Sequence, residues 1–274
     1  MPGDLTDFTK LCIHTITTKP WKVEEAAENY SREGIKGISV WRDALDGRNI
    51  GKTGLLLRNK GLEIVSLVRG GFFPSVSTDI RRKAIEENKK AIDEAALLGA
   101  PLLVLVCGAD PAQPLKVSIS QIKNGIEAVL PYAEKQNIKL AIEPLHPLYS
   151  DTRSAINTLS QANDLAEYFN SSFVGVAVDV YHVWWDPHLK NEIIRCGNNL
   201  FAFHICDWLS PTKDLLNDRG LMGEGCIPLK EIRDWVGQAG FTGFNEVEIF
   251  SNRFWAEDQH RFLKNIKKAY LENS

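Results

Sequence analysis

Residues 173–180 read FVGVAVDV, a nearly continuous apolar run with one carboxylate close to its end. Strands of a parallel sheet are buried on both faces, so they read as unbroken runs of valine, isoleucine and leucine rather than as alternating patterns. Similar short runs recur along the chain, and several of them also end in a polar residue. We expect the other strands at 10–15, 37–41, 63–69, 102–107, 138–143, 200–205 and 244–249.

Amphipathic stretches of helical period separate these runs. Apolar residues in 79–98 recur with a period near 3.6, and Gly99 stands where such a helix would end. The stretch 118–136 has the same pattern, but Pro131 lies inside it, so we expect a kink there or two shorter helices. Further helices are expected near 23–33, 48–60, 153–169, 189–196, 229–239 and 256–271.

Eight strands that each precede a helix predict a (β/α)₈ TIM barrel, an α/β fold. The chain has 274 residues, which suits a single domain over 1–274. An open doubly wound sheet shares the alternation but usually has a glycine-rich turn after its first strand. The segment 10–20, KLCIHTITTKP, has no glycine. The barrel is therefore favoured.

The amino-acid composition limits the kinds of binding partner that can be expected. The net charge is −3, and no cluster of lysine and arginine stands out, so we expect a small molecule rather than a nucleic acid. The five cysteines form no C-x-x-C pair, which argues against a disulfide framework and a thiolate zinc site. The first ten residues lack the features of a signal peptide, and no apolar run approaches the ~18 residues of a membrane span. A cytoplasmic protein without a membrane partner is predicted.

Four successive predicted strands end in side chains that can bind a metal. In a TIM barrel, the carboxyl ends of the strands form the active-site face, so these side chains can meet although they are distant in sequence. They are Glu143, Asp179, His204 and Glu248. One buried carboxylate could belong to a structural salt bridge, but four such residues on four strands predict a metal site. Three carboxylates and one imidazole suit Mn²⁺, the favoured ion, or Mg²⁺, Co²⁺ or Zn²⁺.

Five motifs carry a resemblance to a known family. They are AIEPLHP (141–147), VDVYHVWWDP (178–187), FHICDW (203–208), DRGLMGEGCIPL (218–229) and GFTGFNEVEIFS (240–251). The second half of the chain thereby resembles the xylose isomerase-like TIM barrels, in particular the sugar phosphate isomerase/epimerase family, and the first half matches mainly in its rhythm of strands and helices. The resemblance implies that the four residues above are metal ligands. Glu248 is preferred to Glu246 because it matches the spacing after G-F-T-G.

The resemblance also implies contacts with a substrate. In ketose 3-epimerases, positions equivalent to His182 and Arg219 hold oxygens of the sugar. Two-metal xylose isomerases carry a lysine in E-x-K-P, where this chain has Leu145, so a hydride shift that uses this lysine is not supported. His146 and Tyr149 occupy the same loop, and His146 is a further candidate for substrate binding.

Two residues on the rim of the first half complete the candidate site. Trp41 ends the second predicted strand and could stack on a sugar face or pack against the rim. Arg69 ends the third and could bind a carboxylate, a phosphate or a sugar hydroxyl, or form a salt bridge. His14 ends the first strand and is a weaker candidate. The tryptophans at 184, 185 and 208 could close the pocket or bury a subunit contact, and a homo-oligomer is possible.

The resemblance implies a metal-dependent sugar isomerase or epimerase. Glu143 and Glu248 would act as acid and base as well as ligands, removing and returning a proton α to a carbonyl through an ene-diolate. A dehydratase or lyase acting on a keto-sugar or an inosose is the alternative on the same metal site. Remoter alternatives are a non-catalytic barrel and an enzyme similar to the apurinic DNA endonucleases. The endonucleases need extra histidines at early strand ends, where this chain has Arg69 and Cys107.

Overall fold

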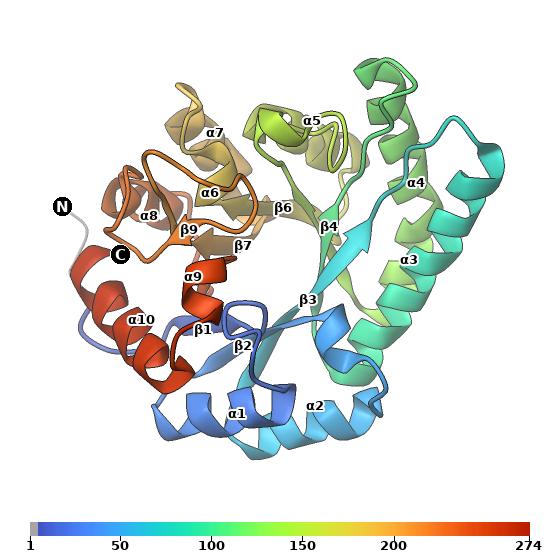
Figure 1. The fold of residues 1–274 in the computed structure, drawn as a ribbon. Coiled ribbons are helices and arrows are strands. Elements are labelled where there is room, and N and C mark those ends of the chain that lie inside the picture. Colours follow the sequence, from blue (N-terminus) through green and yellow to red (C-terminus); the bar gives the residue numbers. More distant parts are fainter. Residues whose placement is uncertain (1–4) are drawn as a thin grey trace.

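The chain forms a closed barrel of eight parallel strands in a computed structural model that describes residues 5–274 (Figure 1). The strands follow the order β1-β10-β7-β6-β5-β4-β3-β2 around the barrel, which confirms the predicted (β/α)₈ fold. Their bounds are β1 Leu11–His14, β2 Gly37–Trp41, β3 Glu63–Gly71, β4 Leu102–Val106, β5 Lys139–Glu143, β6 Val174–Asp179, β7 Leu200–Ile205 and β10 Asn245–Val247. Residues 1–4 belong to the N-terminal stretch that was predicted to lack a signal peptide. They lie outside the residues that the structure describes.

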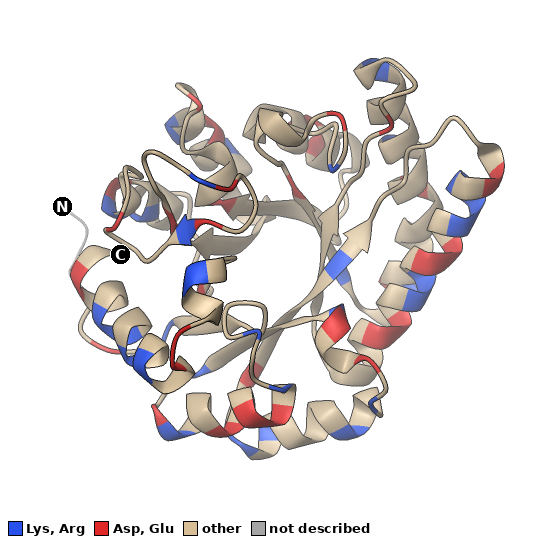
Figure 2. Ribbon diagram, in the orientation of Figure 1, with Lys and Arg blue, Asp and Glu red and all other residues tan. Residues whose placement is uncertain are grey.

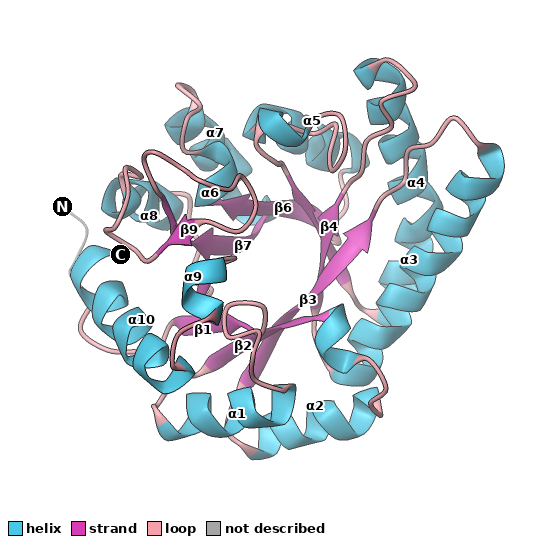
Figure 3. Ribbon diagram, in the orientation of Figure 1, coloured by secondary structure: helices cyan, strands magenta, loops and turns pink. Residues whose placement is uncertain are grey.

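Helices surround the barrel, as the ring of cyan ribbons in Figure 3 shows. They are α1 Val23–Arg32, α2 Ile50–Asn59, α3 Thr78–Leu98, α4 Leu115–Gln136, α5 Leu159–Phe169, α6 Val180–Val183, α7 Leu189–Cys196, α8 Leu229–Gln238, α9 Asn252–Trp255 and α10 Gln259–Asn273. A short antiparallel pair, β8 Asp207–Trp208 and β9 Arg219–Gly220, lies outside the barrel sheet. Within residues 5–274, no helix has the length and apolar character needed to span a membrane.

Two helices differ from their predicted form. The stretch with Pro131 is one helix, α4, so the expectation of two shorter helices was wrong. Pro131 is exposed, and the carbonyl that loses its helical donor there can face water. The helix expected from 153 begins only at Leu159, because Thr158 forms a capping box with Gln161 at that point. The preceding residues form a loop, in which the Asn157 side chain donates to the Leu145 carbonyl.

Small and branched apolar side chains fill the inside of the barrel. The cluster consists of Val68, Leu102, Val104, Ala141, Ala177 and Ala202. Because side chains alternate across a strand, residues two positions further along point to the same inner side. Ala141, Ala177 and Ala202 are each followed at that spacing by a predicted ligand. The fold therefore lifts the polar side chains one layer above an apolar floor, toward the mouth.

Candidate metal centre

The four predicted ligands stand at the carboxyl ends of four neighbouring strands. Glu143 and Asp179 are the last residues of β5 and β6, His204 is the fifth residue of β7, and Glu248 directly follows β10. Strand register also aligns them, since Asp179 pairs with His204 across β6 and β7. One ligand atom from each of the four lies within 4.8 Å of the others, and all four side chains are buried. The structure thus brings the predicted set together at the mouth.

Several polar atoms of this cluster have no hydrogen-bond partner. Glu143 Oε1 and both ring nitrogens of His204 are buried without one. His204 Nδ1 lies 3.0 Å from Glu143 Oε1, close enough for an ion pair but without the alignment of a hydrogen bond. A buried polar atom without a partner is costly, and a divalent ion would satisfy several of them together. The donor set therefore fits a divalent metal ion.

Burial and the neighbouring charges also shift the pKa values of the side chains in this cluster when no metal is bound. Burial raises the pKa of Asp179 to about 7, although the charge of Arg219 opposes the rise. Burial disfavours a charged His204, but the adjacent Glu143 and the neighbouring carboxylates raise the pKa of the imidazole to about 10. Burial would also raise the pKa of Glu248, yet the charges of His14, His204 and Arg219 hold it well below its usual range. The negative charge of three neighbouring buried carboxylates is thus balanced by nearby cationic groups.

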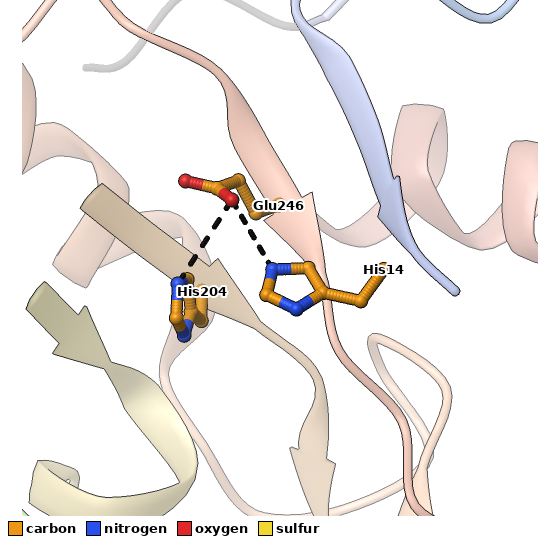
Figure 4. A group of neighbouring side chains, drawn as sticks. All are labelled: His14, His204 and Glu246. Atoms are coloured by element: carbon orange, nitrogen blue, oxygen red, sulfur yellow. Dashed lines mark hydrogen bonds and ion pairs between the residues drawn. The ribbon is translucent and has the colours of Figure 1, made fainter. Parts of the chain in front are cut away.

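A second group of buried polar side chains adjoins the ligands, and Figure 4 shows His14 and Glu246 beside His204. His14 Nε2 is 3.1 Å from Glu246 Oε2, and His14 Nδ1 is 3.0 Å from Glu248 Oε1. The hydroxyl of Ser39 donates to Glu246 Oε2 at 2.5 Å. His14, His204 and Glu246 could themselves hold an ion, but they share His204 with the first group, so the two are not independent sites. Glu246 is the deeper carboxylate, as its spacing predicts.

Two residues of this group were not predicted as part of it. His14 was a weak rim candidate, and Ser39 carried no prediction. His14 is fully buried between two carboxylates, and their charge raises its pKa although burial alone would lower it. Its position at the end of the first strand was the available signal. Ser39 lies in the middle of a run that reads as an ordinary buried strand, so nothing in the sequence marked it.

Arg219 and His182 extend the cluster toward the loops. Arg219 Nη1 donates to Asp179 Oδ2 at 2.9 Å and to Glu248 Oε2 at 3.0 Å. Its Nη2 is 3.2 Å from His182 Nε2. Burial and the charge of Arg219 hold the pKa of His182 well below its usual range, so the ring is neutral and accepts this hydrogen bond. The two predicted substrate-binding residues therefore lie together against the ligands.

Local backbone hydrogen bonds hold Arg219 in place. It belongs to β9, which pairs with β8. The carboxylate of Asp207 accepts hydrogen bonds from the backbone N–H groups of Gly223, Gly225 and Ile227. The guanidinium also lies 4.3 Å from the ring centre of Tyr181 and 4.9 Å from that of Phe250. Arg219 is therefore held between two aromatic rings with its charge directed at the carboxylates.

Two hollows lie at the mouth. A small one of about 30 Å³ is bordered by Glu143, His182, Arg219 and Glu248. A larger one of about 520 Å³ is bordered by Arg69 and Arg153. Trp41, Arg153, Leu216 and Phe250 border both hollows. A further cavity of about 620 Å³ lies at the opposite end of the barrel, near Lys10 and Asn245 at the start of β1 and β10. That end is the stability face of a TIM barrel.

The remaining rim predictions differ in outcome. Trp41 and Arg69 both line the larger hollow. His146 borders neither hollow; it stacks on Trp208 at 5.1 Å between ring centres, and its Nδ1 accepts the backbone N–H of Leu148. Trp184 also lies 5.8 Å from Trp208, so these tryptophans pack with one another beside the mouth. Substrate binding by His146 stays a prediction without support from this geometry.

A loop between β8 and β9 reaches over the mouth (Figure 1). The carbonyl of Leu215 accepts hydrogen bonds from the hydroxyls of Tyr149 and Tyr181. The next residue, Leu216, borders both hollows. The periodicity of apolar residues predicts helices and strands but not irregular loops. This loop was therefore not predicted from the sequence. It forms part of the wall of the site.

Comparison with known proteins supports the same class. Residues 27–266 match the xylose isomerase-like TIM barrel family, and the chain belongs to this family. It is 25% identical over 206 residues to an inosose isomerase from Bacillus licheniformis, covering 73% of this chain and 72% of the relative. It is 23% identical over 250 residues to a fructoselysine 3-epimerase from Shigella flexneri, covering 83% and 85%. The resemblance read from the motifs is confirmed.

Solved structures agree on the fold. The crystal structure of a protein from Sinorhizobium meliloti 1021 has 44% identity and a TM-score of 0.93, with 96% of this chain and 98% of that chain covered. The structure of the protein IolI with a bound zinc atom has 20% identity and a TM-score of 0.79, covering 96% and 97%.

Proposed function

We propose that this chain is a metal-dependent sugar isomerase or epimerase that exchanges a proton next to a carbonyl group. The observation that carries the proposal is the convergence of four buried donor side chains at the barrel mouth, with ligand atoms within 4.8 Å of one another. An inosose isomerase and a fructoselysine 3-epimerase among the relatives support this reaction class.

Glu143, Asp179, His204 and Glu248 would hold one divalent ion. The ion supplies Lewis acidity, which polarises a carbonyl and lowers the barrier to removing a proton from the neighbouring carbon. Oxygen-rich ligation with one imidazole favours Mn²⁺, with Mg²⁺, Co²⁺ and Zn²⁺ as alternatives. The zinc atom bound to the IolI protein supports a divalent ion in a barrel of this fold.

Glu143 and Glu248 would carry the proton. Both border the small hollow, and their strands, β5 and β10, stand on either side of β6 and β7. Their carboxylates therefore approach the hollow from different directions. One removes the proton as the C–H bond breaks, and the electron pair forms a C=C bond with negative charge on the former carbonyl oxygen. The other returns a proton to the resulting ene-diolate. Return to the same carbon gives an epimer. Return to the former carbonyl carbon gives an isomer, in which the neighbouring hydroxyl loses its proton to become the new carbonyl and the former carbonyl oxygen gains one.

Arg219 and His182 would bind the substrate oxygens. Arg219 Nη2 and His182 Nε2 bond to each other, but Arg219 Nε and His182 Nδ1 are buried without a partner, so both groups keep a donor for oxygens at which negative charge develops. The small hollow of about 30 Å³ holds about one water molecule rather than a sugar. Substrate entry therefore requires Leu216 and its loop to move, a common step in enzymes whose loops close over the substrate.

Solvent isotope exchange tests the reaction. Metal-loaded protein is incubated in D₂O with ketoses, sugar phosphates, inososes and 3-keto-glycosides. We expect deuterium at a carbon α to a carbonyl for the substrates that turn over. Glu143→Gln and Glu248→Gln should retain metal and lose exchange, whereas Glu86→Gln, on an exposed part of α3, should behave as wild type. Turnover of every active substrate without deuterium uptake would refute the mechanism, and loss of a hydroxyl or glycosidic group would identify a dehydratase or lyase.

A further inference from the structure

The larger hollow beside the metal centre is lined by an excess of cations. Its charged lining residues are Lys19, Arg42, Asp43, Arg69 and Arg153. Arg42 is already neutralised, since it donates to Glu94 at 2.6 Å and to Glu87 at 2.7 Å. The only carboxylate among the described lining residues is Asp43. Positive charge is therefore left over on this side of the mouth.

Lys19 is exposed and lies over the ring of Trp255. Arg69 and Arg153 are the partly buried cations of this lining. Among residues 5–274, neither side chain forms a hydrogen bond or an ion pair with a carboxylate, although the more distant charges of Asp43 and Glu143 act on Arg69. Aromatic rings hold them instead. Arg69 lies 4.7 Å from the ring centre of Phe72, and Arg153 lies 5.9 Å from that of Tyr149. A guanidinium on an aromatic face keeps its N–H groups free for another partner.

The two groups are close enough to influence each other. Burial lowers the pKa of Arg69, and the charge of Arg153 lowers it further. The register between β3 and β4 shifts between Val68 and Gly70, so Arg69 lies at an irregularity of the strand. Such bulges redirect a side chain at the rim of a barrel. Two partly desolvated cations without a counter-ion are unfavourable, and an anion between them would remove that cost.

We propose that Arg69 and Arg153 form a binding subsite for an anionic group of the substrate, a carboxylate or a phosphate. This inference rests on the proposed function, because it names the class of sugar derivative that the metal centre would process. The reacting carbonyl lies in the small hollow, and the anionic end lies in the larger one. Trp41, Arg153, Leu216 and Phe250 border both, so one extended molecule can occupy the two hollows together.

The separation of charge favours this orientation. Three carboxylates converge at the metal centre, and an anionic group placed there would compete with them for the same positive charge. An anion at the arginine pair lies instead in the larger hollow, where Asp43 is the only carboxylate among the described lining residues. Arginine forks bind carboxylate and phosphate oxygens in a bidentate manner, so the same pair can accept either group.

Matched substrates test the subsite in catalysis. We compare neutral ketohexoses, their 6-phosphates and the corresponding ketohexuronates with wild type, Arg69→Gln, Arg153→Gln and the double variant. Each single variant should lower kcat/KM for one anionic series by roughly 10- to 100-fold, mainly through KM, because a charge-assisted hydrogen bond is lost. Neutral ketohexoses should change by less than about twofold. The series that suffers the larger loss identifies phosphate or carboxylate.

Equilibrium binding tests the subsite without catalysis. Inorganic phosphate and acetate are titrated calorimetrically into metal-free protein, so that they cannot bind the metal ion. The double variant should lose binding of at least one probe. Arg69→Lys and Arg153→Lys should recover part of it, which shows that the glutamine variants fold. Arg82→Gln, an exposed site on α3, is the matched control and should bind as wild type.

The outcomes separate this inference from the proposed function. If wild type exchanges no deuterium with any substrate but phosphate or acetate binding depends on both arginines, the proposed reaction fails and the subsite stands. If exchange occurs but the double variant keeps wild-type kinetics for every anionic substrate and wild-type probe binding, the subsite is overturned and the reaction stands.

Discussion

The two halves of the barrel wall contribute different chemistry to the same mouth. Strands β5, β6, β7 and β10 provide the four converging donors, whereas β1, β2 and β3 provide the groups that support or surround them: His14, Ser39, Trp41 and Arg69. Glu246 and Glu248 illustrate the boundary. One oxygen of the first, Oε2, is engaged by both His14 and Ser39, and the second is shared between His14 and Arg219. Two glutamates of the same segment therefore have different roles because one lies deeper in the barrel than the other.

Removing a donor from the second half should have the largest effect. Asp179→Asn keeps the size of the side chain but removes the charge that faces both the metal position and Arg219. We expect metal affinity to fall by more than about 100-fold, beyond the 10- to 100-fold typical of outer partners. Calorimetric titration with Mn²⁺ measures this. Asp164→Asn, on the surface of α5, is the control. Unchanged affinity would show that Asp179 is not a ligand.

In the first half of the barrel, the free energy of unfolding should be sensitive to substitution of a tightly packed backbone glycine. Gly71 has φ of +107°, and a Cβ there would lie 1.9 Å from the Val106 carbonyl oxygen. Gly71→Ala should lower the free energy of unfolding by about 3 kcal/mol through strain and overpacking. Gly61→Ala has a similar positive φ in open space, so it should cost only about 1 kcal/mol. Urea denaturation compares them, and equal losses would show that β3 and β4 separate easily.

His14 should act as a positioning residue. His14→Gln removes the ring that links Glu246 and Glu248, so we expect kcat to fall about 10- to 100-fold with metal still bound. KM should change less than kcat, because the ring borders neither hollow and reaches them only through Trp41, whose Nε1 donates to His14 Nδ1 at 3.3 Å. His188→Gln, which is exposed, should leave both unchanged. Loss of metal in His14→Gln, equal to that in Asp179→Asn, would remove the distinction between the two halves.

The pH dependence of metal binding should be a graded effect, smaller per pH unit than the loss of a donor. The pKa of His204 is raised from 6.5 to about 10, so its protonation stabilises the metal-free fold fully below pH 6.5, and this stabilisation is lost as pH rises toward 10. A metal ion needs the neutral imidazole. Apparent affinity should therefore rise by about tenfold per pH unit for each proton displaced. Titrations from pH 6.5 to 8.5 measure the slope, and His260→Gln should not change it. A flat profile would contradict ligation by His204.

Much of this architecture could be predicted because its signals are local. Unbroken apolar runs predicted all eight strands, and the ends of four of them placed Glu143, Asp179, His204 and Glu248 at one face of the barrel. The boundary of α5 was wrong, since a capping box at Thr158 overrides an apolar period that continues upstream of it.

The sequence by itself determined which side chains stand at the strand ends, because periodicity and length act within a few residues. Only the tertiary structure decided their partners. Closure of the barrel brings His14 to Glu246 across 232 positions, and the β8–β9 loop brings Arg219 to Asp179 across 40. It also left Arg69 and Arg153 without an ion pair to a carboxylate and packed His146 against Trp208, outside both hollows. Such pairings depend on strand register and loop packing, which no short stretch of sequence encodes.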